Sequence, residues 1–292
     1  MLKLDGVTKI YKVGAFGGKT LTAVDDVSFD LRPGEVVSLI GESGSGKSTI
    51  GRMVLGLLRP TGGSITLDGA RAAPGKAYYR QVQGVFQDPF SCYNPVFKAD
   101  RVLRMIKQEY FPEVASTEWD GRMEESLKAV RLNPGQVLGK YPHQLSGGQL
   151  QRLLIARALL LDLRFLVADE ITSMLDASTR IDVLNLLADL KARGLGVLFV
   201  THDLSLGNYI SEQAVVLYRG RVVEAGTTDR VFGNPLHPYT ARLLASVPQL
   251  TTRWDGVPVV AADGPQEPAA LVEAEPGHFV RRSPVSPREG AV

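Results

Sequence analysis

The sequence predicts an α/β protein with a mainly parallel sheet covered by helices, an antiparallel β layer and a helical insertion. Three short runs are apolar throughout, as in strands that are buried on both faces. They are Val36–Ile40, Phe165–Ala168 and Val197–Thr201. Each run leads into a segment with helical periodicity, namely Lys47–Leu58, Thr179–Arg193 and Leu204–Ile210. Repetition of strand and helix in this order is typical of a parallel sheet.

Four shorter segments alternate apolar and polar residues, as strands with one solvated face do. They are Leu2–Val7, Leu21–Val24, Val27–Leu31 and Ser64–Leu67. Between Gln87 and about Arg157 the strand pattern stops and helical periodicity takes over. We therefore expect a small antiparallel layer near the start of the chain and a helical subdomain over about 88–157.

The last part of the chain has a different composition. After Pro248 the sequence is rich in proline and glycine and shows little periodicity. Segments of this kind bury too little apolar surface to offset the entropy lost on ordering. We predict one domain over residues 1–250 and an irregular extension over 251–292.

Composition and charge limit the class of protein. The 292 residues include 33 Lys and Arg against 31 Asp and Glu, so the charge demands no nucleic-acid or anionic-membrane partner. The richest apolar run, Leu153–Ala168, is interrupted by charged residues and does not read as a membrane span, and Met1–Val7 lacks signal-peptide character. Cys92 is the one cysteine, which excludes an internal disulfide and a cysteine-ligated metal cluster and fits a reducing, cytosolic setting.

The strongest chemical signal follows the first buried strand. Eight residues match the G-x-x-x-x-G-K-[ST] pattern of a phosphate-binding P-loop, with Thr49 next in the chain. They are Gly41, Glu42, Ser43, Gly44, Ser45, Gly46, Lys47 and Ser48. Glycines let backbone N–H groups surround a phosphate, Lys47 can bridge the outer phosphates, and the Ser48 hydroxyl can bind Mg²⁺. The alternative is a Gly/Ser turn with a chance lysine, which would leave the strand, the spacing and the helix unexplained.

A second signal is an apolar strand that ends in two acids, Asp169 and Glu170. Ligands gather at the carboxyl ends of parallel strands. Asp169 is placed to hold Mg²⁺, and Glu170 is placed to orient or deprotonate the water that attacks a γ-phosphate. Acids also cap helices or end strands by chance, so the pair indicates a nucleotide site only in combination with the P-loop.

A third signal is Leu145–Gln149, with the sequence Leu-Ser-Gly-Gly-Gln, directly before an apolar-striped helix. A turn of small residues at a helix N-terminus is a potential anion site. The alternative is a plain capping box, with Ser146 and Gln149 at the required spacing. Two phosphate-like sites in one chain are unusual for a simple kinase or GTPase.

Together, the P-loop, Leu145–Gln149 and the strand that ends in Asp169–Glu170 resemble the nucleotide-binding domain of ABC ATPases. The resemblance covers roughly Met1–Leu250, and the five-residue signature is highly specific to that family. It implies a P-loop fold of ABC type in which two domains dimerise head to tail. The signature residues of one subunit would then close over ATP bound at the other, namely Ser146, Gly147, Gly148 and Gln149.

Further positions match landmarks of this family. Gln87 would be the Q-loop glutamine, which contacts Mg²⁺ or water and links the site to membrane subunits; the alternative is a polar strand-end residue. His202 would be the switch histidine that contacts the γ-phosphate, or else an ordinary hydrogen-bonded histidine. Tyr11 would stack on adenine, or else belong to the core. Ser173–Asp176 resembles the D-loop, which crosses the dimer interface.

Three residues depart from the family pattern. Ile171 replaces a stiffening proline, Met174 adds a bulkier side chain beside the expected interface, and Leu150 stands where a polar residue commonly follows the signature. None of them removes a catalytic group. We therefore expect ATP hydrolysis.

The segment Gly233–Leu244, with its His-Pro-Tyr sequence, resembles dipeptide, oligopeptide and nickel importers, as do Gln87–Pro95 and Tyr141–His143. A surface turn leading into a short helix is the alternative for the first segment. Many such proteins carry tail cysteines that bind an iron–sulfur cluster. This chain has none there, so we expect no cluster and a structural or exposed role for His278.

The resemblance thus implies an ATP-hydrolysing subunit that energises a dipeptide or oligopeptide importer, with ATP and Mg²⁺ bound. The expected partners are a second ABC ATPase subunit (identical or, as we expect, different), two permeases and, indirectly, a solute-binding protein, with no nucleic acid. Its expected place is peripheral, on the cytoplasmic face of the inner (plasma) membrane. A soluble ABC ATPase that remodels nucleic acid or ribosomes, or an exporter motor, is the alternative; the single P-loop disfavours the first and the His-Pro-Tyr segment the second.

Overall fold

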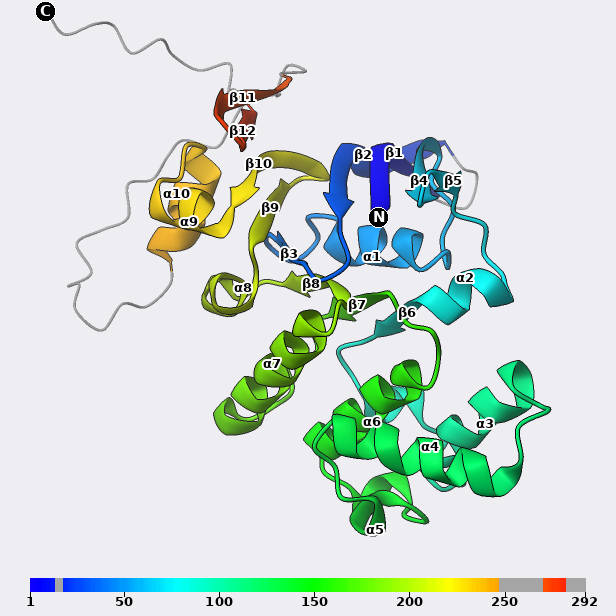
Figure 1. Cartoon of the computed structure of the whole chain (residues 1–292). Helices are drawn as coiled ribbons and strands as arrows, with labels where there is room; N and C mark the ends of the chain where they lie inside the picture. Colours follow the sequence, from blue (N-terminus) through cyan, green and yellow to red (C-terminus); the bar gives the residue numbers. More distant parts are fainter. Residues whose placement is uncertain (14–17, 247–269, 282–292) are drawn as a thin grey trace, which may run out of the picture.

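The computed structural model describes residues 1–13, 18–246 and 270–281. Figure 1 shows two sheets with helices around them and a separate helical part. The strands are β1 (Leu2–Val13), β2 (Lys19–Leu31), β3 (Val36–Ile40), β4 (Gly62–Leu67), β5 (Ala70–Arg71), β6 (Val82–Val85), β7 (Phe165–Asp169), β8 (Gly196–Thr201), β9 (Gln213–Tyr218), β10 (Arg221–Thr227), β11 (Leu271–Glu275) and β12 (His278–Arg281). The helices are α1 (Lys47–Val54), α2 (Lys76–Gln81), α3 (Arg101–Tyr110), α4 (Ser116–Ala129), α5 (Pro134–Val137), α6 (Gly147–Leu159), α7 (Ala177–Ala192), α8 (Leu204–Ile210), α9 (Thr228–Gly233) and α10 (Pro238–Ala245), with single 3-10 turns at Phe90–Cys92 and Pro142–Gln144.

The main sheet has the order β11-β12-β10-β9-β3-β8-β7-β6. The five strands from β9 to β6 run parallel, and β10, β12 and β11 add antiparallel strands at one side. The registers that align the carboxyl ends are Ile40–Thr201, Val200–Asp169 and Ala168–Val85. The loops that follow β3, β8, β7 and β6 therefore meet at one edge of the sheet, where ligands of such sheets bind.

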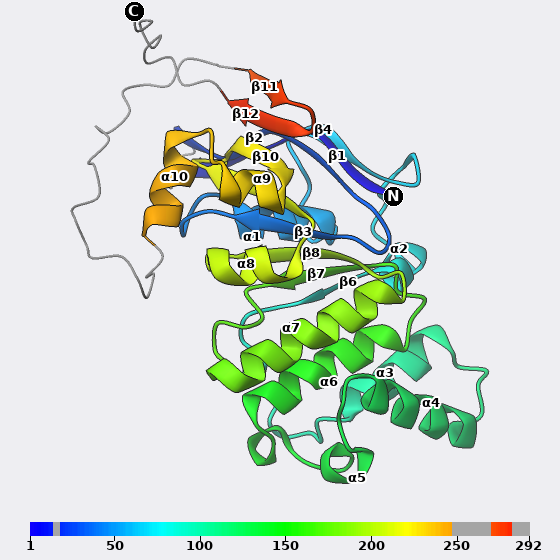
Figure 2. The ribbon, with the colours of Figure 1, turned by 60° about the vertical axis from the view of Figure 1, so that its left-hand side comes forward.

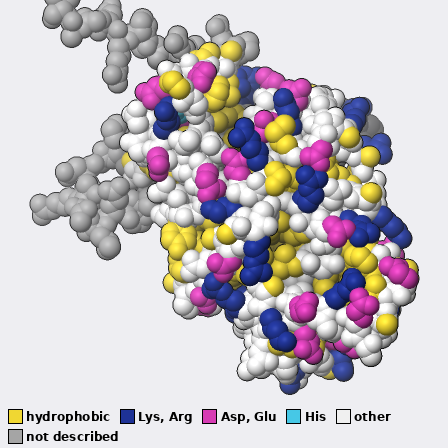
Figure 3. Space-filling view, viewed as in Figure 1, with side chains coloured by type: hydrophobic (Ala, Val, Ile, Leu, Met, Phe, Trp, Pro, Cys, Tyr) yellow, Lys and Arg dark blue, Asp and Glu magenta, His cyan; other side chains and the backbone are white. Residues whose placement is uncertain are grey.

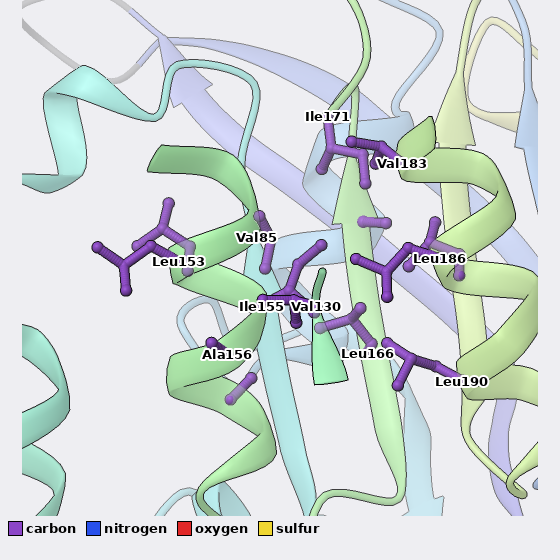
Figure 4. Packing of buried hydrophobic residues seen from close by; sticks show 14 of the residues in the cluster. Val85, Val130, Leu153, Ile155, Ala156, Leu166, Ile171, Val183, Leu186 and Leu190 are labelled. Carbon is purple, nitrogen blue, oxygen red and sulfur yellow. The ribbon is translucent and has the colours of Figure 1, made fainter. Parts of the chain in front are cut away.

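Both faces of the parallel strands are covered, which explains why the sequence reads as unbroken apolar runs. Along β7, Leu166 and Ala168 face one cluster of buried residues, whereas Phe165 and Val167 face another. The first cluster lies against α6 and α7 (Figure 4), and the second against α1 and the smaller sheet. The prediction of an α/β core is confirmed.

The smaller sheet is antiparallel, with the order β2-β1-β4-β5, as predicted. The two predicted segments Leu21–Val24 and Val27–Leu31 form one strand, β2, because a local irregularity at Asp26, with φ of 53°, lets the strand continue. Similarly, the helix predicted over Lys47–Leu58 ends at Val54, just before Gly56 takes a left-handed conformation.

Helices α3 to α6 occupy the predicted insertion and lie together away from the smaller sheet, beside α7 (Figure 2). Helix α6 runs on to Leu159, beyond the expected limit of about residue 157, because Leu153, Leu154 and Ala158 continue its buried stripe. Within the described ranges, no helix combines the length and the apolar character needed to cross a membrane.

The prediction of an irregular tail is wrong for residues 271–281, which form the hairpin β11–β12. Strand β12 pairs with β10 and so extends the main sheet (Figure 1). The turn is made at Gly277, whose φ is 71°. Two strands this short carry too few alternations to stand out from a proline-rich background. The remaining predicted extension, 251–269 and 282–292, lies outside the described residues.

Candidate functional site

The P-loop joins β3 to α1 in the predicted way. Helix α1 begins after Gly46, whose φ is 107° and which gives the helix no side-chain cap. A Cβ at Gly46 would lie 2.5 Å from the Ala23 carbonyl oxygen, so the loop passes too close to β2 for any larger residue. Gly41 and Ser45 are buried, Ser43 and Gly44 are exposed, and Ser48 and Thr49 are half-buried on α1.

Lys47 is 4% exposed, and its Nζ donates hydrogen bonds to the carbonyl oxygens of Gly41 (2.7 Å) and Glu42 (2.9 Å). Burial lowers the pKa of Lys47, and the charges of Glu170, Asp169 and Glu42 partly offset that effect. The Ser45 hydroxyl is also buried and has no hydrogen-bond partner in the part of the chain that the structure describes. A buried cation, an unpaired hydroxyl and an uncapped helix suit a phosphate group.

Two side-chain oxygens that suit Mg²⁺ lie close together, one at the start of α1 and the other at the end of β7. The Ser48 hydroxyl donates to Asp169 Oδ1 at 3.2 Å. Burial raises the pKa of Asp169, with the Ser48 hydrogen bond acting in the opposite direction. No cluster of three His, Cys, Asp or Glu residues that could hold a metal is found among residues 1–13, 18–246 and 270–281. The Ser48 and Asp169 oxygens are ligands of the kind that Mg²⁺ takes when it is bound together with a nucleotide.

Glu170 and His202, which were predicted separately, directly follow β7 and β8 and lie next to each other. His202 Nδ1 lies 3.3 Å from Glu170 Oε1, and the histidine side chain is 59% exposed. Glu170 has a φ of 50°, which a non-glycine residue adopts only under local constraint, and its N–H donates to the Val200 carbonyl at 2.9 Å. The carboxylate is thus fixed at the sheet edge with one side open to solvent.

Two further predicted residues are placed by strands, Gln87 just after β6 and Tyr11 within β1. Gln87 is exposed and follows β6, so it lies at the same sheet edge; Gln151 on α6 holds that strand end by donating to the Phe86 carbonyl at 3.2 Å. Tyr11 is half-buried on β1 and pairs with Leu21 of β2, the strand that passes the P-loop. Within the described part of the chain the Lys47 ammonium bonds to Gly41 and Glu42 and to neither of these side chains, so their roles stay predictions.

The signature segment lies on the helical part and forms the N-terminus of α6. The Ser146 hydroxyl accepts the Gln149 N–H (3.2 Å), and Gln149 Oε1 accepts the Ser146 N–H (2.9 Å). This is the capping box expected from the spacing of Ser146 and Gln149, and it leaves Ser146 exposed. Gly147 is half-buried, and a Cβ at Gly148 would overlap the methyl group of Thr179 on α7. The turn is therefore packed against α7 at Gly148 and exposes Ser146 to solvent.

The departures from the family pattern have a structural reason in two of three cases. Ile171 is 1% exposed and packs near Val183 in the cluster shown in Figure 4. Leu150 is fully buried on α6, and its carbonyl accepts the Tyr93 hydroxyl at 3.1 Å. Met174 is 60% exposed in the predicted D-loop. The first two residues stabilise the core, and only Met174 is available to a partner.

Two P-loop contacts escaped the sequence interpretation. The Gly220 N–H donates to the Ser45 carbonyl at 2.9 Å, and the Glu42 N–H donates to the Tyr239 hydroxyl at 3.0 Å. Tyr239 belongs to the His-Pro-Tyr segment, whose sequence indicates a family and no contact with the P-loop. No local pattern could place it beside a loop almost two hundred residues earlier.

Comparison with known families gives two matches. Residues 24–173 match the model of the ABC transporter family, and residues 223–277 match that of the oligopeptide/dipeptide transporter C-terminal region. The first match covers the P-loop, the signature segment and the acidic strand, and the second covers Tyr239 and ends just before His278.

Individual relatives agree. The chain is 42% identical over 260 residues to a putative peptide import ATP-binding protein of Brucella ovis, covering 85% of this chain and 78% of that protein. It is 38% identical over 277 residues to the oligopeptide transport ATP-binding protein OppF of Bacillus subtilis, covering 89% and 90%. Among solved structures, a dimeric ATP-binding cassette in a post-hydrolysis state with ADP and Pi matches with a TM-score of 0.69 and 31% identity, over 78% of this chain and 99% of that one. From its motifs, its fold and these relatives, the chain belongs to the ATP-binding subunits of the ABC transporter family.

Proposed function

We propose that this chain binds and hydrolyses ATP to energise an ABC importer for dipeptides or oligopeptides. The proposal rests on one observation, that the residues after three parallel strands meet at one edge of the sheet. Lys47 and Ser48 follow β3, Asp169 and Glu170 end β7, and His202 follows β8, all at one edge of the sheet. This edge therefore holds both a phosphate-binding group and a group able to activate water.

The P-loop side of the site binds and orients the triphosphate. The buried Lys47 ammonium already bonds two loop carbonyls, so a phosphate oxygen completes a prearranged set of partners. The Ser45 hydroxyl, which has no partner among the described atoms, offers one more donor. Ser48, Asp169 and Gln87 would hold Mg²⁺, which supplies positive charge to the phosphates when bound.

The opposite side of the site acts on the nucleophile. Glu170 is fixed by its backbone bond to Val200 and keeps one side toward solvent, which suits a group that orients the attacking water and accepts its proton. His202, 3.3 Å from that carboxylate, is placed to contact both Glu170 and the γ-phosphate. The positive φ of Glu170 is a strained backbone conformation of the kind that clusters at functional sites, which supports a functional reason for the strain.

A second ATPase subunit would complete the site. Ser146 is exposed at the N-terminus of α6, on the helical part rather than at the sheet edge, so its natural ligand is the nucleotide of a neighbouring molecule. The solved relative, described as a dimeric cassette with ADP and Pi, supports this arrangement. We expect a different but similar partner subunit, and closure that depends on ATP because the nucleotide is part of the interface.

Permease subunits would dock beside Gln87. A cavity of about 520 Å³ lies between β6 and α3, with Phe86, Val102, Met105 and Leu154 among its lining residues. On the face in Figure 3, hydrophobic side chains gather between the upper and lower parts of the molecule, with charges of both signs around them. An apolar groove next to the Q-loop residue suits a short permease helix, and would hold the chain at the cytoplasmic face of the plasma membrane.

The proposal that the cargo is a peptide comes from the comparisons. The relatives are described as peptide import or oligopeptide transport proteins, and the C-terminal family model is that of oligopeptide/dipeptide transporters. The solute-binding protein and the permeases would select the peptide. The chain would be coupled to that selection only through its permease contact.

Glu170→Gln tests the proposed function. We expect ATP turnover to fall by about 10²- to 10⁴-fold, because the amide keeps the shape but does not accept the proton. ATP affinity should be retained, and ATP should trap the closed dimer, visible by size-exclusion chromatography. Glu124→Gln is the matched control, since it removes an exposed acid that pairs with Lys128 on α4. Near-normal turnover in the Glu170 variant would show that another acid is the base, and failure of the assembled transporter to import labelled peptides would refute the cargo.

A further inference from the structure

The outer side of the P-loop is held by contacts that no phosphate would make. A Cβ at Gly41 would overlap the carbonyl oxygen of Leu217, so the start of the loop lies directly on the end of β9. The Gly220 N–H holds the middle of the loop through Ser45 at 2.9 Å. The third contact is the hydrogen bond from the Glu42 N–H to the Tyr239 hydroxyl.

The Tyr239 contact acts on a peptide group that matters for Lys47. The carbonyl of Gly41 and the N–H of Glu42 belong to the same planar peptide. The carbonyl accepts the Lys47 Nζ at 2.7 Å, and the N–H, which points the other way, donates to Tyr239 at 3.0 Å. Rotation of this peptide would break both bonds together. Tyr239 therefore fixes the orientation of the group that positions the lysine.

Tyr239 is itself firmly placed. It is 2% exposed in the first turn of α10, and its ring lies 4.3 Å from that of Tyr218. The guanidinium of Arg242 lies over the same ring at 5.5 Å. Burial raises the pKa of Tyr239 to about 12, so the hydroxyl stays neutral at physiological pH. The oxygen is thus a fixed, uncharged acceptor.

A chain of buried hydrogen bonds anchors the start of α10 to the C-terminal hairpin. The Tyr239 N–H donates to His237 Nδ1 at 3.1 Å. The Glu224 carboxylate accepts the backbone N–H groups of Leu236 (2.8 Å) and His237 (3.0 Å). The same carboxylate accepts His278 Nε2 of β12 at 2.8 Å, and both side chains are fully buried. These hydrogen bonds therefore join the hairpin, β10 and the start of α10, which lie next to one another in Figure 1.

We propose that Tyr239 is a positioning residue for ATP binding: its hydroxyl holds the Gly41–Glu42 peptide, and thereby Lys47, in the orientation that receives the phosphates. The inference rests on the proposed function and assigns a task to the His-Pro-Tyr segment. The effect falls on nucleotide affinity, because Tyr239 touches neither the water-activating pair nor the signature turn.

Tyr239→Phe in the full-length chain tests the inference, because it keeps the ring and removes only the hydroxyl. Loss of one such hydrogen bond should weaken ATP binding by about 2- to 10-fold, measured by isothermal titration calorimetry. In the assembled transporter KM for ATP should rise by a similar factor while kcat stays within about 2-fold. The melting temperature should change little, because the Tyr218 and Arg242 contacts to the ring remain.

Tyr218→Phe is the matched control, since it deletes a hydroxyl from the stacked neighbour and should bind ATP like the wild type. Unchanged affinity and KM in Tyr239→Phe would overturn the inference. Equal weakening in both variants would also overturn it, because the ring pair rather than the hydroxyl would be responsible. A wild-type chain that does not bind ATP would instead refute the proposed function, so the two failures are distinguishable.

Discussion

The contact between Gly148 and Thr179 allows a prediction that can be worked through atom by atom. Gly148 lies in the first turn of α6, and a Cβ there would overlap the Thr179 Cγ2 methyl group on α7. The threonine is not free to turn, because its Oγ1 donates to Asp176 Oδ2 at 2.7 Å and its N–H donates to Asp176 Oδ1 at 2.9 Å. Gly148→Ala must therefore either separate the two helices or break the Thr179 hydroxyl bond.

Either route has a similar free-energy cost. Forcing an extra methyl group into a packed contact costs about 1–3 kcal/mol, and losing the hydroxyl bond costs about 0.5–1.5 kcal/mol or more. The higher helix propensity of alanine returns at most about 1 kcal/mol. We expect a net loss of about 1–2 kcal/mol in the free energy of unfolding, or a fall of about 2–8 °C in Tm.

Thr179→Ser supplies the matching rescue. It removes the methyl group but keeps the Oγ1 and N–H bonds to Asp176, and the nearest remaining atoms would lie 3.7 and 3.9 Å from the new Cβ. The single Thr179→Ser change should cost about 0.8 kcal/mol for the lost methyl group. In the double variant the two changes should not add, and urea unfolding of all four proteins should give a coupling of about 1–2 kcal/mol. Additive losses, or a Gly148→Ala variant as stable as the wild type, would refute the packing argument.

Two further predictions concern the same part of the molecule. Ser146→Arg should leave ATP binding to the isolated chain nearly intact and abolish ATP-driven dimerisation, measured by light scattering, because we propose that the exposed Ser146 contacts the nucleotide of the partner. Loss of ATP binding in the monomer would contradict that role. Ile171→Ala should lower the free energy of unfolding by about 2–5 kcal/mol because the side chain is buried, whereas Met174→Ala, at an exposed position, should change it by less than about 0.5 kcal/mol. Equal thermal stabilities of these two variants would show that Ile171 does not fill the core.

Local sequence patterns were enough to predict the central strands and the motifs of the site. The buried strands β3, β7 and β8 are visible in the sequence because burial on both faces demands unbroken apolar runs. The P-loop and the acidic strand end are visible because their chemistry requires particular residues at fixed spacing. The capping box formed by Ser146 and Gln149 could also be predicted from the spacing of these residues, although this pattern does not indicate which ligand Ser146 binds.

Tertiary packing decided the rest. The hairpin β11–β12 forms because β10 offers a pairing edge and Glu224 a buried partner for His278, and neither is visible from residues 271–281 alone. Likewise, Tyr239 reaches Glu42 only through the pairing of β9 with β3, which brings the two segments together. Side-chain periodicity and motif spacing are local and can be read from the chain itself, so the sequence alone indicated the buried strands β3, β7 and β8, the helices that follow them, and the family. Contacts between distant segments depend on how the faces of those elements pack, so only the folded structure showed what holds the P-loop from behind.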